Sequence, residues 1–443
     1  MKIINGSEFD LYRKENLRRE ENETSGSQLE KTVREIIEAI RCEGDAALRR
    51  YTEKFDRRCP ENFEVNALQI SNAKNELETS DPDLAGALKF SAENLRRFAL
   101  VQMEQFKDFE TENIPGIFTG QKVIPVERAA VYVPGGRFPL ISSALMGLVP
   151  AFCAGAGEVC LASPPATDAL PDRRILAAAG IAAQICGRME KGLRVFCAGG
   201  AQAVAALALG TETIPRCDVI AGPGNKYVVT AKRLIFGEAG IDLLPGPSDI
   251  LVICSESPGN ELSEIAAADM IAQAEHDPDA RALALVSSQE AAGLLAEAIE
   301  KRLQELPAAE IAKASLEAGG LIIVYKDRDE AVSIANAIAP EHLELQVSDP
   351  SAWMPKLSNY GSLFAGTLAA EVLGDYSAGI NHTLPTKGTA RFTGGLSVRH
   401  FLKTLTTLRC ENRTGYVQAL KAAQTIARAE GLAGHSESAG IRL

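Results

Sequence analysis

The sequence has few aromatic residues and no long uninterrupted hydrophobic run. Aromatics make up 5% of the 443 residues, and Trp353 is the single tryptophan, so a base-stacking platform for single-stranded nucleic acid is not expected. The longest uncharged stretch, residues 138–157, is interrupted by prolines and glycines and predicts a helix, a turn and a strand, not a membrane span. The N-terminus is charged from the start, so no signal peptide is expected.

Paired cysteine motifs and an excess of positive charge are also absent. The nine cysteines are widely spaced without a Cys-x-x-Cys pair, which argues against a disulfide framework and a thiolate zinc module. They are expected to be buried, reduced residues of a cytoplasmic protein. With 46 Lys and Arg against 58 Asp and Glu, the net charge is −12, which argues against a general binder of nucleic acid or anionic membranes. A local basic pocket for a phosphate remains compatible with this charge.

The chain instead alternates between predicted strands and helices. Its length suggests two or three domains, and its 46% hydrophobic and 23% charged residues are typical of a soluble globular protein. Residues 28–100 read as helices. Units of strand, turn and helix follow from about 123 to 245 and again from 250 to 339, which predicts two open α/β sheets with mostly parallel strands. From about residue 386 we expect a helical tail, with one helix at about 414–430.

Three glycine-rich turns close predicted strands of the first alternating block. They are Tyr132–Gly136, Gly199–Gln202 and Gly222–Asn225. Open α/β sheets bind ligands at such positions, and the backbone N–H groups of the helices that follow suit a pyrophosphate. The GxGxxG fingerprint of a typical dinucleotide-binding unit is absent in the right place. Tight turns also need glycine for geometry alone, so a purely structural role stays open at each turn.

Most of the five histidines lie beside carboxylates or amides. Gln273 and His276 are three residues apart, share a helix face and could ligate one metal ion, although a surface pair would look the same. Pro340 fixes the chain just before Glu341 and His342. An imidazole titrates near neutral pH and suits a general base, and the neighbouring carboxylate could activate water. A solvated Glu-His pair at a helix end is the alternative.

The remaining candidates lie toward the C-terminus. Asp375 and His382 belong to a segment broken by glycines and a proline, which is typical of a loop that lines a site and also of an ordinary linker. His435 lies near the end of the chain, where a histidine is usually exposed and idle, and His400 is expected to be structural. Two nitrogens and two oxygens, a set that suits a zinc-like ion, would come from Gln273, His276, Asp375 and His435. Composition does not show that these residues converge.

Several segments together resemble the histidinol dehydrogenase family, from about Glu43 to His435. In chain order they read YVPGG, GGAQAVAALALGT, GPGNKYV, GPSDILV, QAEHDPD, PEHLEL, GDYSAGINHTLPTKGTARF and EGLAGH. Each is modest alone, but their joint order and spacing are specific. The resemblance implies a zinc-dependent enzyme that oxidises L-histidinol to L-histidine in two NAD-linked steps through a bound aldehyde.

The resemblance also implies a role for each candidate. His342 would be the base that takes the alcohol proton, and Glu341 would activate water for the aldehyde step. The ligands of one Zn²⁺ per subunit would be Gln273, His276, Asp375 and His435. The substrate would contact Ser248, Gln273, His276, Glu341, Asp375, His382, Glu430 and His435. The NAD⁺ cofactor would contact Tyr132, Gln202 and Asn225.

The architecture implied is two incomplete Rossmann-like α/β domains with open sheets and a small helical C-terminal tail, in a domain-swapped homodimer. Residues 1–128 with 248–385 would form the domain carrying most zinc and catalytic residues, residues 129–247 would bind NAD, and residues 386–443 would reach the partner's site. Two other readings stay open. One is a related enzyme that oxidises another primary alcohol, and the other is a non-catalytic metal- or nucleotide-binding protein, which the Glu341–His342 pair disfavours.

Overall fold

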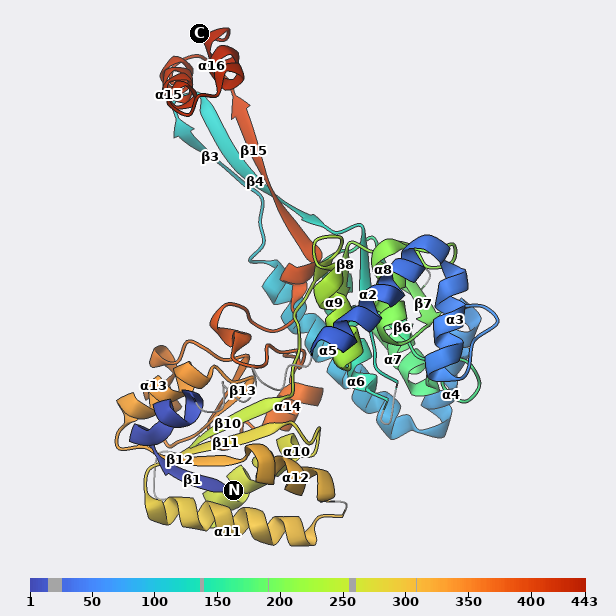
Figure 1. The fold of residues 1–443 in the computed structure, drawn as a ribbon, viewed down its shortest axis with the longest axis vertical. Helices are drawn as coiled ribbons and strands as arrows, with labels where there is room; N and C mark the ends of the chain where they lie inside the picture. Colours follow the sequence, from blue (N-terminus) through green and yellow to red (C-terminus); the bar gives the residue numbers. More distant parts are fainter. Residues whose placement is uncertain (15–25, 136–138, 190, 255–259, 308) are drawn as a thin grey trace.

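The computed structural model describes residues 1–14, 26–135, 139–189, 191–254, 260–307 and 309–443. Two six-stranded sheets form the centres of two α/β domains, and a three-stranded sheet extends away from them toward the C-terminal helices (Figure 1). The prediction of an α/β fold with two open, mostly parallel sheets is therefore confirmed.

The first sheet is parallel throughout, in the order β1-β12-β11-β10-β13-β14. Its strands are β1 (Lys2–Asn5), β10 (Asp249–Cys254), β11 (Arg281–Val286), β12 (Leu321–Val324), β13 (His342–Gln346) and β14 (Ser362–Ala365). The associated helices are α10 (Asn260–Ala274), α11 (Gln289–Glu305), α12 (Glu310–Gly319), α13 (Arg328–Ile338) and α14 (Glu371–Tyr376). Every residue of β10 is buried, because apolar cores lie on both faces of the sheet, as expected for parallel strands.

The second sheet has the order β2-β7-β6-β5-β8-β9 and is parallel except for β2. Its strands are β2 (Glu64–Val65), β5 (Arg128–Tyr132), β6 (Glu158–Ser163), β7 (Leu193–Cys197), β8 (Val219–Ala221) and β9 (Gly240–Ile241). Its helices are α2 (Gly26–Glu43), α3 (Asp45–Asp56), α4 (Ala67–Ser80), α5 (Pro82–Met103), α6 (Ile141–Cys153), α7 (Arg173–Ile185), α8 (Gly200–Leu209) and α9 (Lys226–Ile235).

The N-terminal helices belong to this second domain, which corrects the predicted boundary. Helix α2 packs on α8, α4 on α7 and α5 on α6, and Ile36 and Leu95 lie in the cores of the second sheet. Of the described residues between 1 and 128, only β1 joins the first sheet. The helical pattern predicts the apolar faces of α2–α5, but it does not indicate which of the two sheets those faces pack against. A strand as short as β1 gives no periodic signal of its own.

The helical tail predicted from about residue 386 is confirmed only in its last part, where α15 (Tyr416–Ala429) corresponds to the helix predicted at about 414–430. Val398 and Phe401 are buried in a core of the second domain. Strand β15 (Leu402–Cys410) then pairs antiparallel with β4 (Ile117–Pro125), which also pairs with β3 (Phe109–Ile114). Helices α15 and α16 (Ala433–Gly440) follow. The leucines of β15 recur every third residue, a spacing closer to a helix than to a strand, so the pattern misled.

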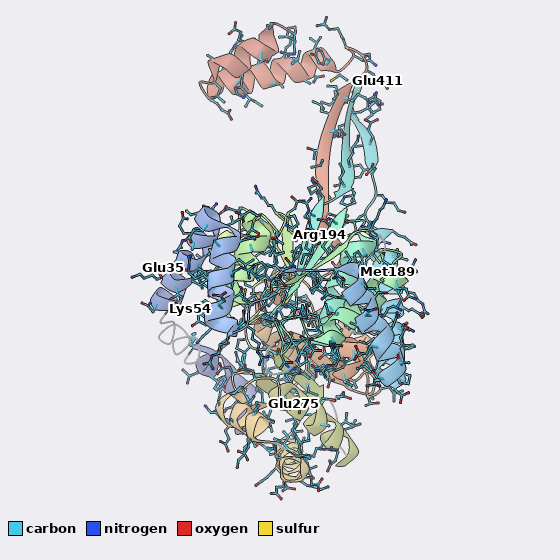
Figure 2. The ribbon with its side chains drawn as sticks, turned by 90° about the vertical axis from the view of Figure 1, so that its right-hand side faces the viewer. Glu35, Lys54, Met189, Arg194, Glu275 and Glu411 are labelled. Carbon is cyan, nitrogen blue, oxygen red and sulfur yellow. The ribbon has the colours of Figure 1, made fainter. Side chains whose placement is uncertain are left out.

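We call β3, β4, β15, α15 and α16 the arm. The arm carries its helices well clear of both domains, and Glu411 lies where the strands meet the helices (Figures 1 and 2). Short 3₁₀ helices complete the fold at η1 (Gly6–Glu8), η2 (Pro350–Ala352), η3 (Met354–Lys356), η4 (Thr389–Arg391) and η5 (Val398–Phe401).

All nine cysteines are free, but their predicted burial is wrong for several of them. Cys160, Cys197, Cys217 and Cys254 are buried, whereas Cys42 and Cys410 are exposed. Exposure of these two follows from their positions, at the end of an amphipathic helix and on the arm. Within the described ranges, no helix combines the length and the hydropathy needed to cross a membrane.

Candidate active site

The candidate active site lies where the two domains meet. Glu341 and His342 stand at the amino end of β13, next to Ser248 and Asp249 at the amino end of the neighbouring strand β10. His382 connects this edge to the second domain, because its Nε2 lies 3.2 Å from the Ser143 hydroxyl of α6. The glycine turns of the second sheet follow the carboxyl ends of β5, β7 and β8.

Glu341 is held by reciprocal hydrogen bonds with Asp249. The Glu341 N–H donates to Asp249 Oδ1 over 2.7 Å, and the Asp249 N–H donates to Glu341 Oε2 over 3.1 Å. Both residues are 5% exposed. Burial raises the pKa of the Glu341 carboxyl to about 8, the charges of Asp249 and Asp375 add to this shift, and the charge of His342 and the hydrogen bond from the Asp249 N–H oppose it. Glu341 is therefore a rigid, buried carboxyl, which excludes a solvated Glu-His pair.

The His342 ring lies between carboxylates on both sides. Its Nδ1 is 3.4 Å from Glu371 Oε1 and 3.4 Å from the Asp249 carbonyl oxygen, and its Nε2 is 3.5 Å from an Asp375 carboxylate oxygen. Burial alone would lower the pKa of His342, but the negative charges of Glu341, Glu371 and Asp375 outweigh it and raise the pKa to about 10. Because Nδ1 faces two acceptors, a neutral ring would keep its proton there and leave a lone pair on Nε2.

Helix α14 supplies two of these carboxylates from one face. Glu371 and Asp375 are four residues apart, the spacing that stacks side chains on a helix. Burial raises the pKa of Glu371 to about 7. Burial opposes ionisation of Asp375 too, but its hydrogen bond with His342 and the charge of that ring lower its pKa. Glu371 was not among the predicted site residues, because a helix of six residues is too short to give a periodic signal.

The residues around Asp375 fit a divalent cation. One donor atom from each of His342, Glu371 and Asp375 lies within 4.8 Å of the others. Gln273, in the last turn of α10, is 1% exposed, and its Oε1 has no hydrogen-bond partner within the described part of the chain. His276 follows that helix closely enough for its charge to lower the pKa of Asp375. Buried carboxylates and an unpaired amide oxygen are costly without a cation to compensate them.

Glu430 and His435, the other two C-terminal candidates, do not lie near Asp375 within one chain. Glu430 and His435 are exposed on the arm and line a groove between α15 and α16. These helices stand apart from both domains (Figure 1). Any contact with the site of Gln273 and His276 must therefore come from a second copy.

His382 is held as a neutral, oriented ring. Its Nδ1 lies 3.0 Å from the Asp375 carbonyl oxygen, and burial lowers its pKa. The adjacent Asn381 side chain donates to the Met146 carbonyl over 2.7 Å. These contacts bind the 379–382 segment to α6 and fix His382 at the domain junction.

Two predicted cofactor residues meet at the turn that opens α8. The Tyr132 hydroxyl accepts a hydrogen bond from the Gly200 N–H at 3.0 Å, and burial raises its pKa to about 12. Gln202 is 1% exposed, and its Nε2 donates to Asp56 Oδ2 over 3.4 Å. Burial raises the pKa of Asp56 to about 6. Sequence reasoning missed Asp56 because it is the last residue of α3, far from any glycine turn in the chain.

The third glycine turn is fixed by buried charge. Asn225 caps α9 by accepting hydrogen bonds from two backbone N–H groups. Lys232 and Asp242 form a fully buried ion pair, and each also hydrogen-bonds the backbone of Gly222. The pair leaves the Gly222–Asn225 turn little freedom, which suits a turn that positions a ligand.

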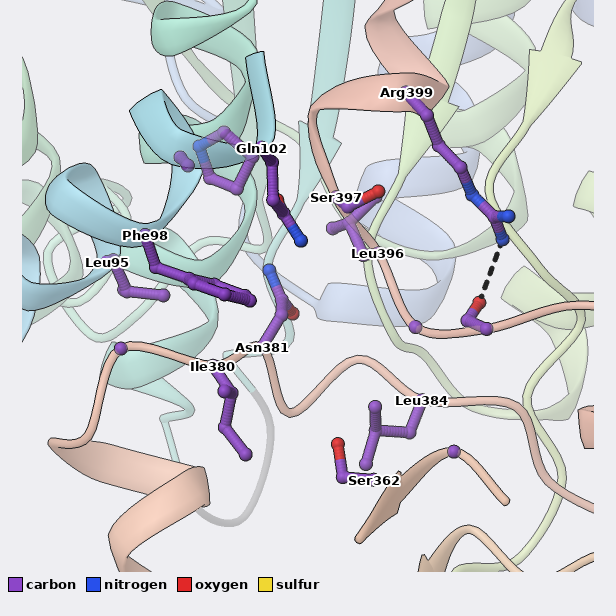
Figure 3. A pocket seen from close by; sticks show the side chains of 16 residues that line it. Leu95, Phe98, Gln102, Ser362, Ile380, Asn381, Leu384, Leu396, Ser397 and Arg399 are labelled. Atoms are coloured by element: carbon purple, nitrogen blue, oxygen red, sulfur yellow. Dashed lines mark hydrogen bonds between the residues drawn. The ribbon is translucent and has the colours of Figure 1, made fainter. Parts of the chain in front are cut away.

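A separate cavity of about 320 Å³ lies on the other side of the 379–382 segment (Figure 3). It is bounded by Phe98 of α5, Asn381, Leu396 and Arg399, whose guanidinium donates to the Gly394 carbonyl over 3.2 Å. None of the predicted site residues lines it. It is therefore distinct from the candidate active site.

Comparison with known proteins agrees with the resemblance seen in the sequence. A family model described as histidinol dehydrogenase matches residues 18–443. The histidinol dehydrogenase of Aquifex aeolicus is 42% identical over 419 residues, which cover 94% of this chain and 92% of that protein. That of Thermus thermophilus is 42% identical over 414 residues, 94% of each chain. A crystal structure of the Elizabethkingia anophelis histidinol dehydrogenase matches with a TM-score of 0.85 at 32% identity, covering 94% of this chain and 92% of that one.

Proposed function

The chain belongs to the histidinol dehydrogenase family and is an NAD-dependent oxidoreductase, and from this premise we propose that it oxidises L-histidinol to L-histidine in two NAD-linked steps at one zinc site. The observation that carries the proposal is the buried Glu341–His342 pair, which offers two separate bases at one position. Oxidation of an alcohol to an acid needs both, one for the hydroxyl proton and one for water.

Zinc would be held by Gln273, His276 and Asp375, with His435 of the partner subunit as the fourth ligand. The unpaired Gln273 Oε1 and the buried carboxylate of Asp375 support this assignment. A bound Zn²⁺ would act as a Lewis acid on the substrate oxygen and would fix the amino alcohol for reaction. Ser248, His382 and Glu430 would contact the substrate around that position.

His342 serves the first oxidation. The step needs the neutral ring, which the positive charge of a bound Zn²⁺ near Asp375 would favour by opposing the raised pKa of His342. Nε2 of the neutral ring accepts the hydroxyl proton, while Nδ1 keeps its own proton toward Glu371 and the Asp249 carbonyl. The hydrogen on the alcohol carbon leaves with its electron pair to NAD⁺, the group that Tyr132, Gln202 and Asn225 would bind. Glu371 lowers the cost of the positive ring that forms, as a buried carboxylate does behind a catalytic histidine.

Glu341 serves the second oxidation. Its carboxylate removes a proton from the water that attacks the aldehyde carbon, giving a hydrate. A second hydride then leaves that carbon to another NAD⁺, and the product is the carboxylic acid. A general base works best with a pKa near the working pH, and the pKa of Glu341 at about 8 meets this condition.

The position of Asp56 supports binding of NAD⁺ in preference to NADP⁺, which carries a 2′-phosphate. Its carboxylate lies beside Gln202, where it would accept hydrogen bonds from ribose hydroxyls and repel a 2′-phosphate. No GxGxxG turn is needed for this contact, because the carboxylate comes from helix α3.

The arm supports a homodimer with shared active sites. Several of its apolar side chains are at least 44% exposed, namely Leu405, Leu408, Ile426, Leu432 and Ile441. A surface of this kind on a projecting element is typical of one that packs on a second copy. Glu430 and His435 would then enter the partner's site. The free cysteines, in turn, support a reducing cytoplasmic location.

Zinc-loaded protein incubated with NAD⁺ and L-histidinol tests the proposal, with other primary alcohols as the matched panel. We expect NADH only with L-histidinol. If folded, zinc-loaded protein oxidised another alcohol but not L-histidinol, the substrate assignment would be wrong and the chain would be a related enzyme for that other alcohol.

A further inference from the structure

A basic cavity of about 90 Å³ lies behind the candidate active site, within the first domain. Three separate segments of the chain contribute its cationic side chains, which are Arg13, Arg281, Lys387 and Arg391. One side of the cavity is apolar and is formed by Phe9, Tyr12, Leu283, Ala337 and Ile338. We call it the basic cavity. The chemistry proposed above uses none of these residues.

Three of the four cations of the basic cavity, Arg13, Lys387 and Arg391, have no carboxylate partner in the described part of the chain. The chain has a net charge of −12, and many of its arginines and lysines pair with a carboxylate. Within the described ranges, no ion pair of 4.0 Å or less joins Arg13, Lys387 or Arg391 to a carboxylate. Asp249 is the one acidic residue among those that line the cavity. Positive charge is therefore concentrated at a point where the protein as a whole is negative.

The turn that carries two of these cations is built around Asp249. Lys387 has a φ of 53°, a left-handed conformation that a lysine rarely adopts. Its backbone N–H lies near enough to the Asp249 carboxylate to favour the ionised form of that group, and the Arg391 guanidinium donates to the Ala337 carbonyl over 3.2 Å. Backbone strain of this kind is concentrated at ligand-binding positions. The turn thus presents Lys387 and Arg391 at the rim in a fixed arrangement.

We propose that the basic cavity binds a tetrahedral oxyanion, either inorganic phosphate or the phosphate group of a small monoester. Guanidinium groups match phosphate oxygens in a bidentate geometry, and a lysine adds a point charge. A cavity volume of about 90 Å³ is several times the roughly 10–15 Å³ that one water molecule needs, which leaves room for such a group. The apolar side formed by Phe9 and Tyr12 would accommodate the carbon atoms of a monoester.

The basic cavity is separate from the substrate site but shares a wall with it. Asp249 lines the cavity and also hydrogen-bonds Glu341, and the Arg281 N–H donates to the Ser248 carbonyl over 3.0 Å. None of Gln273, His342 and Asp375 lines the cavity. A ligand there would contact the segment that holds Ser248 and Asp249 without occupying the position of the alcohol.

Binding of inorganic phosphate to the full-length protein tests the proposal. Thermal unfolding and titration calorimetry would be run with phosphate and with chloride at equal ionic strength, without alcohol, NAD⁺ or zinc. We expect phosphate, and not chloride, to raise the unfolding temperature in a saturable manner. Because alcohol and cofactor are absent, the outcome does not depend on the proposed activity.

Charge-removing variants locate the site. Lys387→Gln and Arg391→Gln should each weaken phosphate binding about tenfold or more, since each removes a charge-assisted hydrogen bond. Arg391→Lys should recover part of the loss. The matched controls are Lys313→Gln on α12 and Arg328→Gln on α13, exposed cations of the same domain that should keep wild-type affinity.

A comparison with glycerol phosphate identifies the source of the oxyanion. If glycerol phosphate binds more tightly than inorganic phosphate, the apolar side of the cavity contacts the carbon atoms of the ester. If it binds equally or more weakly, the ligand is free phosphate. Equal effects of phosphate and chloride would overturn the proposal. So would wild-type phosphate affinity in Lys387→Gln, whose exposed side chain can be changed without disturbing the core.

Discussion

Glu371 Oε1 lies 3.4 Å from Nδ1 of His342, and both side chains are almost fully buried. The two residues come from different elements, the first residue of α14 and the first residue of β13. The carboxylate faces the ring nitrogen that points away from Asp375. In the mechanism proposed above, Glu371 would orient His342, whereas Asp375, on the opposite side of the ring, would hold the metal.

Separate substitutions distinguish these two roles. Glu371→Gln should lower kcat about tenfold to a hundredfold while zinc content and the KM for L-histidinol stay near wild type, because only the charge behind the base is lost. Asp375→Asn should lower zinc content. Elemental analysis and steady-state kinetics provide the readouts. If Glu371→Gln lost zinc as Asp375→Asn does, Glu371 would be a metal ligand and its orienting role would be wrong.

Substitution of each of the two bases should slow a different oxidation step. His342→Asn should lower the rate of alcohol oxidation about 10²- to 10⁴-fold, the usual contribution of a general base. Glu341→Gln keeps the carbonyl oxygen that accepts the Asp249 N–H, so the fold should persist. It should slow oxidation of added L-histidinal more than oxidation of L-histidinol. Equal loss with both substrates would contradict the division of labour, and unchanged turnover in His342→Asn would remove that residue from the mechanism.

Mixing two inactive variants tests the shared active site. In a dimer of His342→Asn with His435→Asn, one site would carry both changes and the other would be intact if His435 acts in the partner's site. Random exchange of subunits should then restore about a quarter of wild-type activity, since half of the dimers are mixed and half of their sites are intact. If His435 served its own subunit, every site would carry a change and the mixture would stay inactive.

Asp56 should make stability depend on pH. Burial raises its folded-state pKa to about 6 from 3.8, so the folded protein binds the proton more tightly than the unfolded chain. Its contribution favours the folded state below pH 4 and is lost as pH rises through about 6. Asp56→Asn should therefore be more stable than the wild type at pH 7 by about 1 kcal/mol, since partial exposure screens the charge, and equally stable near pH 4.

Thermal unfolding between pH 4 and 7 measures this difference. Glu53→Gln, on the exposed side of the same helix, is the control for loss of a negative charge. The same Asp56→Asn protein should bind NAD⁺ more weakly and discriminate less against its 2′-phosphate. A stability difference that does not change with pH would show that the Asp56 carboxyl is not desolvated in solution.

Much of the fold could be predicted because its signals are local. The strands and turns between Tyr132 and Asn225 follow one another closely, and β5, β7 and β8 each lead into a visible glycine turn, whereas β6 is followed by two prolines. The Glu341–His342 pair also stood out, since acid and base are adjacent in the chain. Strand β15 could not be recognised, because the exposed arm places no alternating apolar face along it.

The partners of the predicted residues could not be found in the same way. Asp249 meets Glu341 only because β10 pairs with β13 in a register that sets Ile250 opposite His342. Glu371 reaches the ring from a helix of six residues, too short for a periodic signal. These contacts arise from tertiary packing, which local patterns do not encode. The proposed role of His435 would depend on a second chain, which no pattern within one sequence encodes.

The stoichiometry of NADH to histidine tests the central claim most directly. Purified zinc-loaded protein would be given L-histidinol and excess NAD⁺, with NADH measured by absorbance and histidine counted as product. The account predicts two NADH for each histidine, because both oxidations occur at the position served by Glu341 and His342. One NADH for each alcohol consumed, with the aldehyde released and no histidine formed, would contradict it.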